Sequence, residues 1–397
     1  MSRPAPSFAL ILLFAAIIAT TPLAIDMYLP AMPQLADSLH TDGVLVQQSL
    51  SIFLAFYGLG MLLFGPLADA IGRRPLALWG LTGFISASLL LSQTSSIEWF
   101  LTWRALQALA GSAATVVVPG IIRAIYQEHT AKGMSYVSMT MMLAPLLAPA
   151  IGSLVLFLAS WQWIFVVLAL YALVILLLSA KFLPEITSKA QRNKLDFFGS
   201  YQVVFAHKTA RPLIAISMFS SFSFFCFLTA VPFVYIEHFA VDEQTFSLLF
   251  GLNVLMLISA NFINSRLVSR VGSPKMLKAG WLSAMCFAVG LVLVSHLDLS
   301  LVWTVLMIAP LMASLGLIAT NADALILMAF PNHSGTATAV IGTLRFGAGA
   351  LAGPLLALWP QQNTVPFALL MLSGVLAITV ARLFIKPAQA QPTAELS

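Results

Sequence analysis

Long apolar stretches recur from one end of this chain to the other, and they limit the possible folds more than any other feature. A helix needs about twenty mostly apolar residues to cross the hydrocarbon core of a bilayer. Only 8% of the 397 residues are charged and 60% are hydrophobic, which leaves little sequence for a water-soluble domain. The sequence therefore predicts an all-α membrane protein with about twelve transmembrane helices. The expected spans cover roughly residues 7–30, 47–68, 76–95, 99–122, 134–158, 162–183, 212–236, 245–266, 276–296, 299–329, 335–358 and 365–385.

The first apolar stretch has an alternative interpretation as a secretory signal, because it follows Arg3. Its length, the presence of Asp26 and the lack of a clear small-residue cleavage site favour a span. We therefore expect it to be the first transmembrane helix.

The positions of the basic residues predict the orientation. With the N-terminus in the cytoplasm, seventeen of the nineteen Lys and Arg residues lie in or beside cytoplasmic connections. The connections on the other side hold no Lys or Arg; their acidic residues are Asp37, Asp42, Glu98, Glu237, Asp242, Glu243 and Asp298. This asymmetry follows the positive-inside rule, so both termini are expected in the cytoplasm. It also argues against a basic face for nucleic acid.

Residues of the types that hold metals or carry out covalent chemistry are scattered. Cys226 and Cys286 lie in separate expected spans without metal-ligand spacing, so packing roles are expected. The six histidines form no cluster of the kind that a metal needs. A phosphate-binding Gly-Lys-Ser/Thr loop is absent from the sequence. We therefore expect no metal, no cofactor and no ATP hydrolysis.

The longest polar connection divides the chain. We expect an N-terminal six-helix bundle over residues 1–183, a cytoplasmic linker over 184–211 and a C-terminal six-helix bundle over 212–397. Two pairs of segments indicate an internal repeat. "GPLADAIGRRP" resembles "SRLVSRVGSPK" at an offset of 200 (Gly72 to Gly272), and "APLLAPAIG" resembles "GAGALAGP" at an offset of 205 (Pro149 to Pro354). Each pair alone is weak, but the nearly constant offset predicts two pseudo-symmetric halves, as in many transporters.

The segment "GPLADAIGRRP" concentrates polar residues between the second and third spans. Its two glycines allow close backbone approach, and its proline suits the first turn of the next helix. Asp69 has Arg73 and Arg74 as nearby partners. A plain positive-inside hairpin is the alternative, but it needs neither the acid nor the spaced glycines.

This segment resembles the signature loop of the major facilitator superfamily, and the resemblance extends along the whole chain. The matching loop residues are Gly65, Asp69, Gly72, Arg73 and Arg74. The resemblance implies the major facilitator fold. It also implies that the loop latches the two halves together on the cytoplasmic side when the carrier faces outward.

Four further stretches are similar to the drug/proton antiporter branch, in particular to Bcr/CflA-type multidrug efflux transporters. They are "DMYLPAMP", "RALQALAGSAA", "APLLAPAIGS" and "FPNHSGTATAVIGTLRFGAGAL". This resemblance implies drug resistance by proton-coupled efflux across a bacterial inner membrane, by a protein expected to be a monomer. Ala108 and Ala148 depart from the branch, which usually has Gly there, and Ala124 stands where Asp is common. The last departure removes one acid that could carry a proton.

Four formal charges lie inside the expected spans: Asp26, Arg104, Asp323 and Arg345. Each costs about 2.5–3.5 kcal/mol at the centre of an isolated helix, so each is expected to be paired or to face a wet cavity. Asp26 and Arg104 share a depth toward the side opposite the termini. Asp323 and Arg345 lie between the middle and the inner surface.

We expect Asp26 to bind the coupling proton, with Arg104 as its partner. Burial favours the neutral acid, whereas a nearby arginine favours the carboxylate, so the balance changes when the cavity opens, closes or fills. A static ion pair that only fixes packing is the alternative. For Asp323 and Arg345, a structural or gating pair and a direct substrate contact stay equally open.

The fifth span carries a stripe of small residues, Ala144, Ala148 and Gly152, with Pro145 and Pro149 beside it. Such a stripe permits close helix packing and bending. The family resemblance implies an antiporter motif, in which a bendable, closely packed helix seals against ion leak. Ordinary small-residue packing is the alternative.

A substrate cavity that is mostly apolar with a few polar groups is expected, as in most small-molecule sites. Its candidate residues are Tyr28, Gln107, Tyr136, Phe222, Phe225, Asn253, Asn261 and Asn321. Any single aromatic residue in a span is more often part of the core or exposed to lipid.

The sequence as a whole predicts a secondary transporter that exports a small organic molecule in exchange for protons, by alternating access. The expected partners are the substrate, protons and membrane lipid. A dedicated exporter of one metabolite, such as a nucleoside, or a proton symporter is the alternative within transport. A membrane-embedded enzyme needs a nucleophile, a metal cluster or paired carboxylates at one depth, and the sequence offers none. A purely structural protein leaves the four intramembrane charges unexplained.

Overall fold

The computed structural model describes residues 8–126, 130–185, 202, 204, 206–330, 334–359 and 363–385. Within these ranges, the side chains of residues 8, 69, 123, 126, 130–142 and 334–336 are not described. The regular elements of the described residues are all helices, so the predicted all-α class is confirmed.

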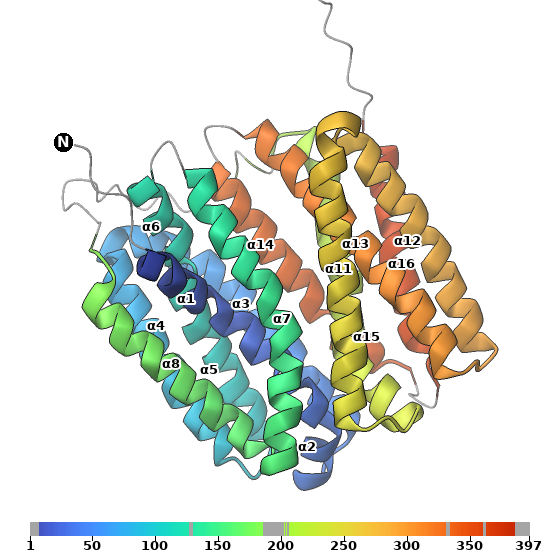
Figure 1. Ribbon diagram of the computed structural model, residues 1–397, viewed down its shortest axis with the longest axis horizontal. Helices are drawn as coiled ribbons and strands as arrows, with labels where there is room; N and C mark the ends of the chain where they lie inside the picture. The colour runs from blue at the N-terminus through green and yellow to red at the C-terminus, as the bar shows by residue number, and fades with distance from the viewer. Residues whose placement is uncertain are drawn as a thin grey trace, which may run out of the picture.

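The helices form two groups that lie side by side (Figure 1). The first group consists of α1 (Phe8–Asp26), η1 (Leu29–Ala31), α2 (Met32–Ser38), α3 (Gly43–Ile71), α4 (Arg73–Ser92), α5 (Ile97–Thr115), α6 (Val117–Tyr126), α7 (Thr130–Leu158) and α8 (Gln162–Phe182). The second consists of α10 (Ala210–Pro232), η4 (Phe233–His238), α11 (Glu243–Val271), α12 (Ser273–His296), α13 (Leu301–Ala329), α14 (Ser334–Ala350), α15 (Ala352–Leu356) and α16 (Val365–Leu383).

The lengths of these helices confirm a multi-pass membrane protein. Eleven helical segments of the described chain are long and apolar enough to cross a membrane. Helix α7 supplies a further long helix at the place of the fifth expected span. The bundle boundaries at residues 183 and 212 stay a prediction, because most of the expected linker, 184–211, lies outside the described residues.

Helices α3 and α11 repeat the same local design, one in each group. Both have 29 residues, and their bounds differ by 200. Each ends at a glycine with a positive φ, 107° at Gly72 and 86° at Gly272, before the next helix begins. Because a side chain is strained at such φ values, glycine permits this sharp connection. The two halves therefore share a turn geometry as well as a sequence offset.

Asp242 explains why α11 begins where it does. Its carboxylate accepts hydrogen bonds from the backbone N–H of Thr245 at 2.7 Å and from the Thr245 hydroxyl at 3.2 Å. An aspartate at this position satisfies a backbone donor of the first turn that has no partner inside the helix. The same hydrogen bonds hold the pKa of the exposed Asp242 carboxyl below its ordinary value.

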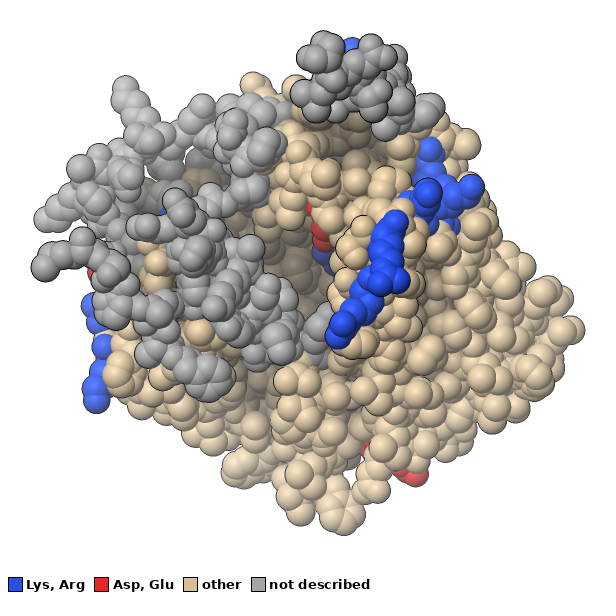
Figure 2. Space-filling view, turned by 45° about the horizontal axis from the view of Figure 1, so that its top comes forward, with Lys and Arg blue, Asp and Glu red and all other residues tan. Residues whose placement is uncertain are grey.

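The two ends of the molecule differ. Helix α1 begins and α16 ends at the top of Figure 1, which we call the terminal side. There the molecule is hollowed, and acidic and basic atoms lie inside the hollow (Figure 2). On the opposite side the two groups are in contact: the Ser153 hydroxyl of α7 lies 2.5 Å from the Ser247 hydroxyl of α11, and the Gly353 N–H of α15 donates to Ser51 of α3 at 2.9 Å. The structure is therefore open on the terminal side and closed on the other.

Candidate functional site

Asp26 and Arg104 are both buried, but the structure does not pair them. Asp26 is the last residue of α1 and is 3% exposed, and Arg104 of α5 is 0% exposed. The described residues supply no hydrogen-bond partner for Oδ1 of Asp26 and no ion pair between these two side chains. The static ion pair considered as an alternative is therefore not present in this conformation.

Aromatic rings take the place of the acid next to Arg104. The guanidinium carbon lies 4.3 Å from the ring centre of Tyr28 and 4.4 Å from that of Phe53. Its Nη1 donates to the Ala24 carbonyl at 3.1 Å and to Oε1 of Gln107 at 2.7 Å. The negative faces of aromatic rings attract a cation, and this attraction grows when water is excluded. The arginine is thereby stabilised without the carboxylate.

The second charged pair lies on the terminal side of the second group, and its members are in contact. Nη1 of Arg345 on α14 donates to Oδ2 of Asp323 on α13 at 2.9 Å. Ser217 of α10 donates to the other carboxylate oxygen at 2.6 Å, and Nε of Arg345 donates to Ser221 at 2.7 Å. The side chains of Arg345 and Asp323 are 36% and 26% exposed. Three helices thus hold a hydrogen-bonded charge pair that water reaches.

A row of aromatic rings runs between the two charged sites. Tyr57 of α3 lies 6.1 Å from Phe53 and 4.6 Å from Phe346 of α14, measured between ring centres. Phe346 lies in turn 5.6 Å from Phe225 of α10. The row therefore begins beside Arg104 in the first group and ends in the second. Phe53, Tyr57 and Phe346 were not among the predicted site residues, because nothing in the sequence distinguishes them from other aromatic residues in apolar spans.

The structure distributes the eight expected cavity residues over several places. Tyr28 and Gln107 belong to the Arg104 site, and Phe225 ends the aromatic row. Two asparagines connect α11 and α13: Nδ2 of Asn321 donates to Asn264, and Asn261 accepts from Thr320. The remaining members are the buried Phe222 and Asn253, and Tyr136, whose side chain lies outside the described residues.

The arginines of the loop between α3 and α4 contact the first group. Arg73 donates to the Gly120 carbonyl at 2.7 Å, and Arg74 donates to the Ala180 carbonyl at 2.5 Å. Gly65 has open space where a Cβ would lie, so the close approach expected there is absent in this conformation. The Asp69 side chain lies outside the described residues. The latch between the halves stays a prediction.

The small-residue stripe of α7 faces the end of α1. A Cβ added to Gly152 would meet the backbone carbonyl of Met27, the residue after Asp26. Ala144 and Ala148 are buried as well. Prolines 145 and 149 both lie within α7. The stripe therefore packs within the first group, next to the acid that the sequence singled out.

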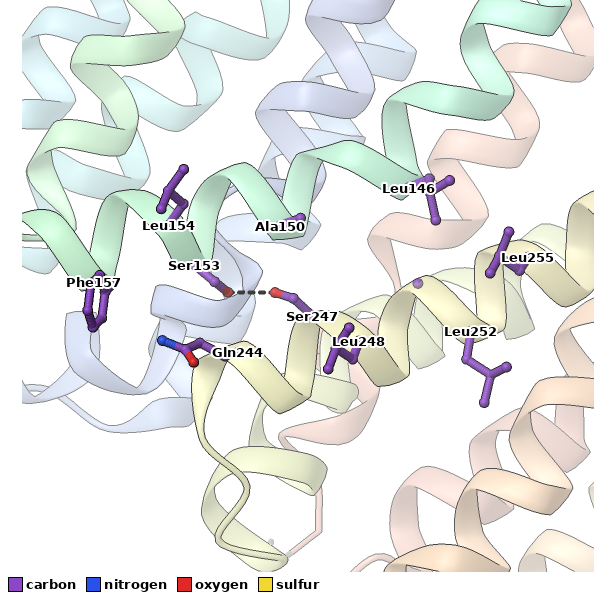
Figure 3. Close-up of a pocket in the computed structure, with 11 residues that line it drawn as sticks. Leu146, Ala150, Ser153, Leu154, Phe157, Gln244, Ser247, Leu248, Leu252 and Leu255 are labelled. Carbon is purple, nitrogen blue, oxygen red and sulfur yellow. Dashed lines mark hydrogen bonds between the residues drawn. The ribbon is translucent and has the colours of Figure 1, made fainter.

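The other face of α7 borders an apolar groove toward α11, with a volume of about 750 Å³ (Figure 3). Its lining residues are Leu146, Ala150, Ser153, Leu154, Phe157, Gln244, Ser247, Leu248, Gly251, Leu252 and Leu255. The Ser153 and Ser247 hydroxyls meet in this groove, and the Ser247 hydroxyl also donates to the Pro149 carbonyl at 2.9 Å. The groove carries no charge and is separate from both charged sites.

Two helical groups, a hollow that opens on one side and charged side chains within the spans define a membrane transporter. The chain belongs to the Major Facilitator Superfamily, whose family model matches residues 12–354. It is therefore a transporter of small molecules and not an enzyme.

Known relatives include drug-resistance proteins. The bicyclomycin resistance protein homolog of Haemophilus influenzae is 29% identical over 389 residues, which cover 97% of this chain and 98% of that protein. The chloramphenicol resistance protein of Pseudomonas aeruginosa is 31% identical over 370 residues, 87% of this chain and 83% of that one. The resemblance to drug-resistance transporters inferred from the sequence is thereby confirmed.

Solved structures show the same fold at low sequence identity. A D-xylose-proton symporter superposes with a TM-score of 0.75 at 15% identity, over 96% of this chain and 98% of its own. A bacterial homolog of the human lysosomal transporter Spinster, in an inward-facing and unoccupied conformation, gives a TM-score of 0.74 at 13% identity, over 97% of both chains. The predicted major facilitator fold is confirmed.

Proposed function

We propose that this protein exports small organic molecules from the bacterial cytoplasm in exchange for protons, by alternating access. Its curated relatives named for bicyclomycin and chloramphenicol resistance support drug-like substrates. Asp26 is the residue that we assign to the proton.

The observation that carries this proposal is the isolation of Asp26. An ionised carboxylate without a counter-ion is costly at this depth, whereas a neutral acid is tolerated. Oδ1 of Asp26 has no partner among the described residues, and Arg104, the cation expected as its partner, lies against Tyr28 and Phe53. The surroundings of Asp26 therefore suit a proton-loaded acid.

The orientation follows from the basic residues. The terminal side carries Arg73, Arg74, Lys181 and Arg266 among its described cations, and a cytoplasmic face is typically basic. With that side in the cytoplasm, the hollow of Figure 2 opens inward. The conformation is then the one that takes up a substrate for export.

Exchange requires Asp26 to meet different surroundings in the two conformations. Opening of the opposite side separates α7 from α11 and brings the end of α1 toward the external water, where the acid takes up a proton. In the inward-open state, movement of Arg104 away from its two rings and toward Asp26 stabilises the carboxylate and releases the proton inward. Substrate in the hollow promotes this movement through the aromatic row.

The test measures protons released by the purified protein in weakly buffered detergent solution when chloramphenicol is added. The wild-type protein is expected to release protons, and Asp26→Asn is expected to release none. Asp42→Asn removes an exposed acid on the same side of the protein and serves as the matched control, with release expected to be unchanged. Full release by the Asp26 variant would remove this residue from the coupling mechanism. Proton uptake by wild type would indicate symport instead.

A further inference from the structure

The charged cluster of the second group has hydrogen-bond donors to spare. Both oxygens of the Asp323 carboxylate accept hydrogen bonds, one from Ser217 and the other from Arg345. Arg345 uses Nε and Nη1, but its Nη2 donates to no residue that the structure describes. A guanidinium presents its donors in a fixed planar arrangement, so the unused N–H groups of Nη2 have a defined direction. The cluster therefore offers positioned donors beside a carboxylate whose charge is already paired.

The side chains of this cluster are partly exposed. Arg345 is 36% exposed, although it lies on a helix between the two groups, and the hollow of Figure 2 contains acidic and basic atoms. The guanidinium donates to Asp323 and Ser221, and Ser217 donates to the Asp323 carboxylate, so the arginine is held in place before any ligand arrives. Such preorganisation lowers the entropic cost of binding.

Aromatic side chains lie on the same two helices, α10 and α14, that hold the cluster. Phe346 follows Arg345 on α14, and its ring centre lies 4.6 Å from that of Tyr57 in the first group. Phe225 lies one turn beyond Ser221 on α10, so both residues are on one face of that helix. A flat apolar molecule in the hollow would have rings to pack against beside a hydrogen-bond donor.

The charges select among substrates. Asp323 and Arg345 cancel, and Asp323 already has partners for both oxygens. Asp26, the other acid deep within a described span, is buried. A lipophilic cation would therefore find no free counter-charge among the described residues of the hollow, whereas an acceptor oxygen would find Nη2 of Arg345.

We propose that Arg345, held by Asp323 and Ser221, binds the carbonyl or carboxylate oxygen of an aromatic substrate, with the Phe346–Tyr57 ring pair as the apolar surface for its ring. The substrate class is neutral or anionic, and lipophilic cations are excluded. This inference rests on the proposed export function and names the substrate class of the same hollow.

The test compares equilibrium binding of three probes to the purified protein, without a proton gradient: chloramphenicol (neutral), chloramphenicol succinate (anionic) and tetraphenylphosphonium (cationic). Wild type is expected to bind the first two and to exclude the third. Arg345→Lys keeps the charge but lacks the planar set of guanidinium donors, so binding of both acceptor-bearing probes should weaken about tenfold or more.

Removal of each partner should change the charge preference in opposite directions. Asp323→Asn leaves the arginine unpaired, so affinity for the succinate ester should rise about tenfold over that for chloramphenicol. Arg345→Gln leaves the acid unpaired and should admit the phosphonium cation. Arg270→Gln, an exposed arginine of α11, is the matched control and should change none of the three affinities.

Equal changes for all three probes in the Asp323 and Arg345 variants would overturn the proposal and leave a structural pair. Unchanged binding in these variants would also overturn the proposal. The same holds if the wild-type protein prefers the cation or binds neither of the acceptor-bearing probes. Asp26→Asn separates this inference from the proposed function: it should keep chloramphenicol binding and lose proton release. Failure of the proton assay with Arg345-dependent binding intact would contradict the coupling mechanism alone.

Discussion

The two halves of this transporter each carry an aspartate and an arginine inside the spans, but they hold them in different ways. In the first half, Asp26 and Arg104 are buried and do not pair, and the Arg104 guanidinium packs against aromatic rings. In the second half, Asp323 and Arg345 are paired, hydrogen-bonded to serines and partly exposed. The two sites differ more in their access to water than in their residue types.

This difference suits a division of labour. A buried, unpaired acid is sensitive to any movement that brings a cation or water near, which is the property that coupling requires. A paired and wetted site changes little on its own and presents a fixed donor to a ligand. We therefore assign coupling to the first site and substrate recognition to the second.

The largest expected effect tests which arginine the fold depends on. Arg345→Met leaves the Asp323 charge without its cation and removes two charge-assisted hydrogen bonds, so the free energy of unfolding should fall by about 2–3 kcal/mol. Arg104→Met loses the contacts with the rings and the hydrogen bonds, but it also removes the cost of burying an unpaired charge. The free energy of unfolding is therefore expected to change by less than about 1 kcal/mol. Thermal unfolding of the purified variants measures both, with Arg270→Met as the exposed control. A greater loss at Arg104 would mean that the buried cation has a partner acid after all.

A second experiment disturbs only the buried site around Asp26. Gly152→Ala places a Cβ against the Met27 backbone next to Asp26, and overpacking of this kind should cost about 2 kcal/mol and reduce proton release. Gly251→Ala on α11 is the matched control, because its Cβ would meet only Cδ1 of Leu146 at 3.6 Å, an ordinary contact. Unfolding curves and the proton assay should change for the first variant only. Equal tolerance of both substitutions would show that the packing of α7 on α1 does not protect the acid.

The smallest expected effect comes from the hydroxyl contact that closes the opposite side. Ser153→Ala removes its two hydrogen bonds to α11, together worth about 1–2 kcal/mol, so the outward-open population should rise about five- to thirtyfold and water should reach the Asp26 site. Distances between spin labels at Thr94 and Ser300, measured by pulsed electron resonance, report this shift. Ser265→Ala loses only a bond within its own helix and should leave the distances unchanged. If the outward-open population does not change, other contacts stabilise the closed opposite side.

The fold was predictable from the sequence because span length and the distribution of charge are local properties. The positions of helices α3 and α11, and of the glycines that end them, could be anticipated from the offset of 200 residues. The charged residues were also recognisable, because charge is rare inside a span.

The partners of these residues were not predictable. Whether Arg104 turns toward Asp26 or toward Tyr28 and Phe53 depends on the side-chain packing of three helices, which no spacing along one helix encodes. The small-residue stripe of α7 was recognisable as a packing face, but the sequence did not reveal that it faces α1. Tyr57 and Phe346 come together only because α3 and α14 cross between the halves.

The mutual neutrality of Asp323 and Arg345 bears on the energy source of the proposed exchange. If the hollow carries a neutral molecule outward and Asp26 carries a proton inward, each proton exchanged moves one positive charge into the cell. The membrane potential then contributes about 2.3 kcal/mol per 100 mV for each proton, in addition to any pH difference. An exporter of this kind would continue to work when the internal and external pH are equal, provided that the membrane stays polarised.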